Sequence, residues 1–158
     1  MFGHIILLFL YIENITKIDF YINFKKLNQK QEIVGLMIYM HAKAMELTCY
    51  THDDRITAER QLLKCRHKQQ DPHEPPTDFF LVRYSPDPRN VLIIMVYHEH
   101  TQKFVNYMFH YRIGRFGKPV VYFNKELFYT SEHEIEFENI KDIMNALDHY
   151  GYKACIIK

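Results

Sequence analysis

The chain has 158 residues, of which 47% are hydrophobic and 25% are charged, and its formal net charge is +1. This length fits one domain that can bury a core without disulfides or metal ions, and the composition excludes a disordered chain. A net charge close to zero provides no long-range field for nucleic acid or an anionic membrane, so an anion site has to be local.

The N-terminal residues form an extension to which the sequence assigns no role. The apolar run at 5–12 is far shorter than the roughly 20 residues of a membrane span. It also lacks the basic start and the cleavage site of a signal peptide. We therefore expect an extension over residues 1–45, a folded domain over 46–158 and no membrane span.

Two helices and four strands are expected after residue 50. A helix at 55–66 follows capping residues, and a second at 137–150 has apolar residues at helical spacing and stops at Gly151. The expected strands are residues 79–84, 91–97, 104–113 and 120–123. This order predicts an α+β fold in which a central antiparallel sheet is flanked by two helices.

Arg83 is the most informative residue, because it ends a strand that is otherwise apolar. Its guanidinium is expected to lie against the sheet, partly out of water, where an unpaired charge is costly and needs an anion. A planar guanidinium grips phosphate through two parallel hydrogen bonds. A carboxylate of the same chain would satisfy it equally well, and residue spacing does not decide between the two.

Other polar side chains could join Arg83 in one pocket. Side chains alternate along a strand, so Ser85 shares a face with Arg83, while His110 and Arg112 share a face of a later strand. If these faces coincide, the four side chains line one polar pocket. Arg55, at the start of the first helix, could reach the same place.

Four segments, in order, carry a resemblance to a known family. Residues 80–83 (FLVR) match the FLVR motif of Src-homology-2 (SH2) domains letter for letter. Residues 55–63 (RITAERQLL) resemble the first helix of that family, 110–113 (HYRI) its HYKI strand, and 137–144 (FENIKDIM) the start of its second helix. The resemblance covers residues 50–158, about two thirds of the chain.

The resemblance implies a role for each matching residue of a phosphotyrosine pocket. Arg83 would make the two-pronged contact with the phosphate, and Arg55 would touch the phosphate and the phenol ring. Ser85 would donate a hydrogen bond to a phosphate oxygen. His110 would shape the pocket wall and brace Arg83, and Arg112 would pack along the ring.

The resemblance also implies an SH2-like fold and a function without catalysis or cofactor. Such a chain would bind tyrosine-phosphorylated proteins in the cytoplasm, as an adaptor or targeting module of tyrosine-kinase signalling. Tyr111 would help to set specificity for the residues after the phosphotyrosine. The segment at 124–136, which borders the specificity pocket in relatives, is longer than usual. The alternative function is that of a degenerate domain that binds other proteins independently of phosphate.

Other functional signals are weaker. His98, Glu99 and His100 do not form the zinc motif HExxH, because Gln102 stands where the second histidine would be. We therefore expect a solvated turn there and no metal site. No nucleophile and base are paired in a way that indicates an enzyme, and no basic stripe indicates nucleic-acid binding. The sequence leaves the oligomeric state open.

The three cysteines, Cys49, Cys65 and Cys155, are widely spaced. This spacing indicates neither a disulfide framework nor a zinc site, so reduced thiols are expected.

Overall fold

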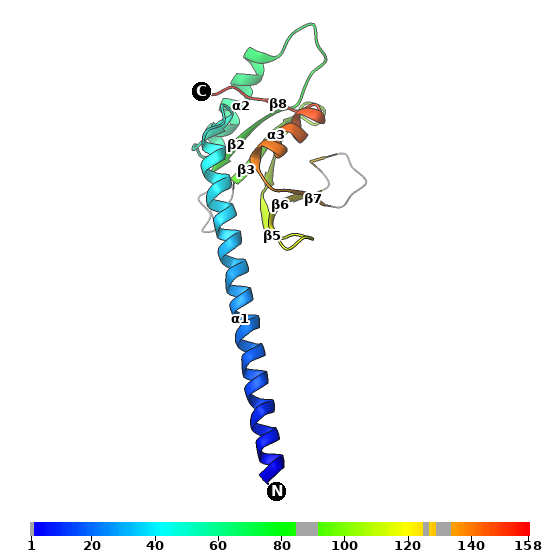
Figure 1. The fold of residues 1–158 in the computed structure, drawn as a ribbon. Helices are drawn as coiled ribbons and strands as arrows, with labels where there is room; N and C mark the ends of the chain where they lie inside the picture. Colours follow the sequence, from blue (N-terminus) through cyan, green and yellow to red (C-terminus); the bar gives the residue numbers. More distant parts are fainter. Residues whose placement is uncertain (1, 85–91, 125–126, 129–133) are drawn as a thin grey trace.

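The protein has an α+β fold, and the computed structural model describes residues 2–84, 92–124, 127–128 and 134–158 (Figure 1). The helices are α1 (Phe2–Met45), α2 (Arg55–Gln69) and α3 (Ile140–His149). The strands are β1 (Tyr50–Thr51), β2 (Phe79–Tyr84), β3 (Leu92–His98), β4 (Lys103–Met108), β5 (His110–Ile113), β6 (Pro119–Asn124), β7 (Glu134–Phe137) and β8 (Lys153–Ala154).

The described strands form two sheets. In the first sheet the order is β1-β2-β3-β4, and β8 also pairs with β2. β2, β3 and β4 are antiparallel, as expected, whereas β1 and β8 run parallel to β2, so the sheet is mixed. The second sheet has the order β5-β6-β7 and is antiparallel.

The strand expected at 104–113 divides at Phe109. The Phe109 amide still donates a hydrogen bond to the Leu92 carbonyl oxygen at 3.2 Å, and the Phe109 ring is buried in the core. After this residue the chain leaves β3 and pairs with β6 instead. The consequence is that β5 belongs to a different sheet from β2.

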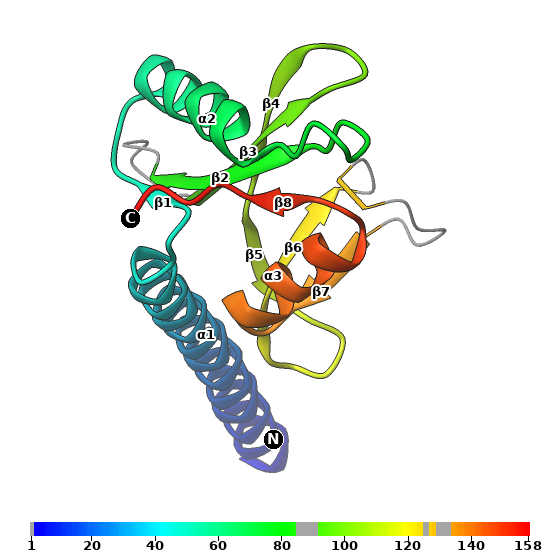
Figure 2. The same ribbon diagram turned by 90° about the horizontal axis from the view of Figure 1, so that it is seen from above.

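Helices cover both faces of the first sheet (Figure 2). On one face, Ala58 and Leu62 of α2 pack in a cluster with Phe79, Leu81 and Met95. On the other face, α3 and the last turns of α1 enclose a larger cluster. α2 begins at Arg55, as expected, because the Asp54 side chain caps it by accepting the Thr57 amide at 2.8 Å; the helix then continues beyond the expected end.

α3 begins three residues later than expected. Phe137 belongs to β7, and the Asn139 side chain caps the helix by accepting a hydrogen bond from the Asp142 amide at 2.9 Å. Gly151, with φ of +86°, follows the helix in the left-handed conformation that glycine adopts most readily. The end of this helix was therefore predicted correctly from the glycine.

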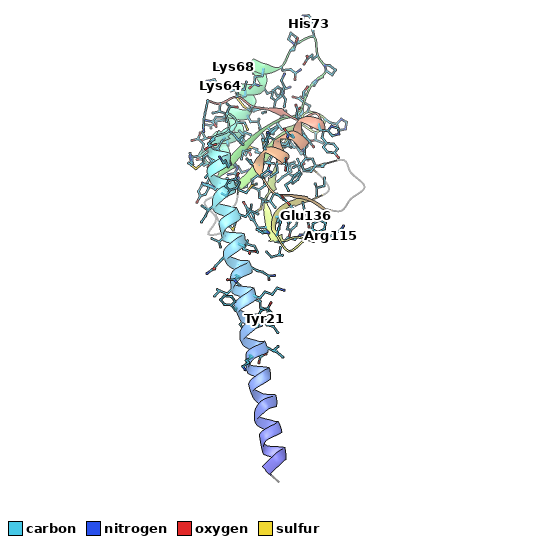
Figure 3. All side chains as sticks on the ribbon, viewed as in Figure 1. Tyr21, Lys64, Lys68, His73, Arg115 and Glu136 are labelled. Carbon is cyan, nitrogen blue, oxygen red and sulfur yellow. A yellow bond between two sulfur atoms is a disulfide. The ribbon has the colours of Figure 1, made fainter. Side chains whose placement is uncertain are left out.

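The N-terminal extension is one continuous helix of 44 residues, which at 1.5 Å per residue is about 66 Å long. Its C-terminal end is part of the fold, because Met40 and Ala44 are fully buried in the larger core cluster. Farther out, Tyr21 projects from a stretch that no other part of the described chain accompanies (Figure 3). Among the described residues, no helix has the length and apolar character to cross a membrane.

The expectation of three reduced cysteines is wrong for two of them. Cys65 on α2 and Cys155 after β8 form a disulfide across 90 residues of sequence, with their Cα atoms 5.7 Å apart. The pairing arises because β8 returns beside β2, which places the C-terminal segment against α2. Cys49 is a free, buried thiol.

Candidate functional site

Arg83 lies at the end of β2, on the face of the sheet that α2 covers. Alternation along β2 turns Phe79 and Leu81 toward α2, and Arg83 follows on the same side. The residue is 7% exposed and is, with Thr51, one of two buried polar side chains among the described residues. A guanidinium therefore occupies a position where the preceding residues of that face are wholly apolar.

One hydrogen bond holds the Arg83 side chain. Its Nε donates to Oδ1 of Asn106, on β4, at 3.3 Å. In the described part of the chain, no carboxylate forms an ion pair with Arg83, and its two terminal nitrogens have no hydrogen-bond partner. The alternative of an internal carboxylate partner thus has no support from the described residues.

The surroundings of Arg83 disfavour its charge. Burial lowers the pKa of the guanidinium, and the charge of Arg55 lowers it further, while Glu59 and Asp54 oppose these effects. Arg55 lies in the first turn of α2, where its Nε donates to Glu59 Oε1 at 3.0 Å. Two guanidinium groups thus act on each other at this end of the sheet, and an anion between them would remove the repulsion.

Two of the other predicted residues of the pocket have their described partners in the second sheet. Ser85 is outside the described residues. His110 stacks against the Tyr122 ring at 5.2 Å between centroids. Arg112 donates to Glu136 at 2.6 Å, and its guanidinium lies 4.4 Å from the centre of the Tyr122 ring.

His110 and Arg112 are on β5, in the second sheet, and within the described residues neither forms a hydrogen bond with Arg83. Asn106 makes the contact with Arg83 that was predicted for His110. Their place in the second sheet follows from the division of the predicted strand at Phe109. In Figure 3, Glu136, the partner of Arg112, lies at the edge of the molecule formed by the second sheet.

Tyr111 borders a second feature, an apolar groove of about 970 Å³ between α1 and the sheets. The groove is lined by Ile33, Val34, Met37, Ile38, His41, Ala42, Met45, His52, Tyr84, Met108, Phe109, His110, Tyr111 and Tyr122. Two buried polar atoms in these walls, Nδ1 of His41 and the hydroxyl of Tyr111, have no hydrogen-bond partner among the described residues. Burial raises the pKa of Tyr111, whereas burial and the nearby His52 lower the pKa of His41.

Asn106 was not predicted from the sequence. The signal that was available is alternation: Asn106 is an amide within the mostly apolar and aromatic segment 104–109, and its register partner Met95 packs under α2. Without the register of β3 and β4, however, the sequence does not show that this amide lies across the sheet from Arg83.

The turn at 98–100 has structural partners. His98 contacts Asp78 through Nδ1 at 2.9 Å and the Tyr107 hydroxyl through Nε2 at 2.7 Å. Glu99 forms an ion pair with Arg66 of α2. These contacts tie the β3–β4 hairpin to the rest of the fold.

In comparisons with known proteins, no protein-family model and no curated protein match this sequence. The resemblance to SH2 domains therefore depends on the four short motifs alone.

Proposed function

We propose that this chain is an SH2-like module that binds tyrosine-phosphorylated peptides, with Arg83 gripping the phosphate. The observation that carries the proposal is the buried guanidinium of Arg83, which has no carboxylate partner among the described residues. A protein retains such a charge at a cost to its own stability, so a ligand that neutralises it is the physical reason for its presence.

Phosphotyrosine has the chemistry that this position requires. Its phosphate carries a charge close to −2 at neutral pH and three acceptor oxygens. With Nε fixed by Asn106, the terminal nitrogens of Arg83 remain for two parallel bonds to phosphate oxygens. Arg55 supplies a second positive charge, provided that its side chain leaves Glu59. The long tyrosine side chain is the phosphorylated side chain best able to reach a guanidinium at this depth.

This function assigns no catalytic step and no cofactor to the chain. An adaptor or targeting role in tyrosine-kinase signalling would place the protein in the cytoplasm.

The test is fluorescence polarisation with a library of phosphotyrosine peptides and their unphosphorylated copies. We expect selected phosphopeptides to bind with a Kd on the order of 1 μM, and Arg83→Ala to weaken binding by about 100-fold or more. Arg60→Ala is the matched control, because it removes the same charge from an exposed position of α2. Equal binding by the wild type and Arg83→Ala would refute the proposal.

The degenerate-domain alternative makes the opposite prediction from the same library. Binding that does not depend on phosphorylation and that survives Arg83→Ala would support it. Tyr111 and His110 would then matter as walls of the apolar groove, where Arg83 is not among the lining residues.

A further inference from the structure

The part of α1 that leaves the folded unit exposes large apolar side chains. Phe24, Leu27, Val34, Ile38 and Met45 have exposed fractions between 39% and 66%. A helix this long receives most of its stability from packing, and an isolated helix with an exposed apolar face is marginal in water. The described chain therefore leaves this face of α1 largely open, although Val34, Ile38 and Met45 also line the groove against the sheets.

The spacing of these five residues is that of a coiled coil. With Gln31 and His41 included, the steps from Phe24 to Met45 alternate between three and four residues, which is the 3.5-residue repeat of positions a and d. Of the two polar members, His41 turns toward the folded unit, where its ring lies 5.2 Å from that of Tyr84. We call the row Phe24, Leu27, Gln31, Val34, Ile38 and Met45 the α1 seam.

The folded unit leaves the α1 seam accessible to another helix. Met40, which is buried in the core, is two residues from Ile38 and so lies about 200° around the helix from it. At its C-terminal end the seam forms one wall of the apolar groove, so a second helix there would lie over the open side of that groove. Gly35, beside the seam, has no atom of the described residues within 4 Å of where a Cβ would lie, which leaves room for a second backbone.

We propose that the α1 seam pairs with the same seam of a second copy of this chain, as a parallel two-stranded coiled coil. Self-pairing in register explains Gln31, because each amide would meet its own copy and the two would hydrogen-bond. In an antiparallel pair centred on Gln31, Met45 would face Lys17 instead. Lys25 and Lys26 lie outside the seam, so pairing does not bring them together.

The seam is long enough for two helices to pack along it. From Phe24 to Met45 it is about 32 Å long. A stable interface needs ~800 Å² per partner, so the residues that flank the five apolar side chains would have to contribute as well.

The experiment is sedimentation velocity of the full chain between about 1 and 100 μM. The wild type should sediment with twice the 19.2 kDa mass of one chain. Ile38→Glu should raise the dimer Kd at least about tenfold, because it places a charge at an a position. The matched control is Tyr39→Glu, since Tyr39 is exposed but lies about 100° around the helix from Ile38, and it should stay within about twofold of the wild type.

Orientation and fold are checked separately. Leu27→Cys should cross-link to its copy under mild oxidation if the pair is parallel, whereas Ile22→Cys, exposed on another side of the helix, should not. Far-UV circular dichroism at the same concentrations verifies that each variant is folded. A wild-type monomer at about 100 μM, an Ile38→Glu variant as dimeric as the wild type, or cross-linking at position 22 but not at 27 would each overturn the proposal.

Discussion

Replacing Arg83 by methionine should stabilise the free protein while abolishing phosphopeptide binding. Methionine has a similar length, so it fills the same space without the charge. A residue that serves mainly to bind a ligand shows this opposition between stability and function, whereas a residue that serves the fold loses both. The variant therefore distinguishes a ligand-gripping arginine from a structural one.

The expected magnitude follows from the surroundings of Arg83. Removing a buried charge relieves a desolvation cost of a few kcal/mol, and the repulsion from Arg55 disappears with it. Against this gain stands the hydrogen bond to Asn106, which contributes about 1–2 kcal/mol. The net expectation for Arg83→Met is a rise of about 1–2 kcal/mol in the free energy of unfolding. If the charge were neutralised by an internal carboxylate, the same change would cost about 3–5 kcal/mol.

The assay is urea unfolding of the wild type and Arg83→Met at pH 7, read as a shift of the midpoint at constant slope. The complementary variant is Asn106→Asp, which places a carboxylate 3.3 Å from Arg83 Nε while preserving the shape of the side chain. It should also stabilise the protein, and it should weaken phosphopeptide binding because the new carboxylate competes with phosphate. Destabilisation by Arg83→Met of 2 kcal/mol or more would refute the reasoning.

Three further predictions test other contacts. Arg112→Ala should weaken peptide binding by less than about threefold and cost at most about 1 kcal/mol, because Arg112 is partly exposed and already paired with Glu136; calorimetric titration and urea unfolding measure the two effects. The Cys65–Cys155 disulfide closes 90 residues of chain, so its reduction should lower the free energy of unfolding by about 2–5 kcal/mol. In the same unfolding assay, the stability of the Cys65→Ser variant should not change when reductant is added. Burial raises the pKa of Cys49 to about 11 from an ordinary value of 9.0. The neutral thiol therefore contributes about 3 kcal/mol to stability below pH 9, and this contribution is lost as the pH rises through 11. Urea unfolding at pH 8 and pH 11 measures the loss, and Cys49→Ala should reduce the dependence of stability on pH.

The elements that were predictable from the sequence are those with strong local signals. The strand at Phe79–Tyr84 is a short apolar run ended by prolines, and α2 follows a capping aspartate at helical spacing. Both pack against the same core, so propensity and burial agree. The end of α3 was also predictable, because Gly151 adopts a left-handed conformation that other residues avoid.

The elements that the sequence did not reveal depend on distant partners. The division at Phe109 is set by pairing with β3 on one side and β6 on the other, and no local pattern marks it. β8 and the disulfide at Cys155 exist because the C-terminal segment returns beside β2. In α1, some apolar residues near the C-terminal end are buried in the folded unit, whereas others along the helix are exposed. The apolar residues therefore do not follow one face of the helix, and the sequence shows no clear helical period there.

The residues of the candidate site also differ in whether the local sequence predicts them. Arg83 was identifiable because a charge within an apolar strand is a local anomaly, and Arg55 because it opens a capped helix. The contribution of Asn106, and the placement of His110 and Arg112 in the second sheet, depend on strand register and on one bend. Motif resemblance alone would have grouped all of these residues into one pocket.

The two arginines of the site differ in how strongly solvent screens them. The Arg55 side chain is 62% exposed, so its attraction for phosphate acts through water and weakens as salt is added. Arg83 is buried, so its hydrogen bonds to a ligand would form where screening is weak and a charge is otherwise costly. With a net charge of +1, the chain has no general field to draw phosphate toward it. Recognition by this chain would therefore depend on Arg83 at short range, with Arg55 assisting only while a ligand replaces Glu59 as its partner.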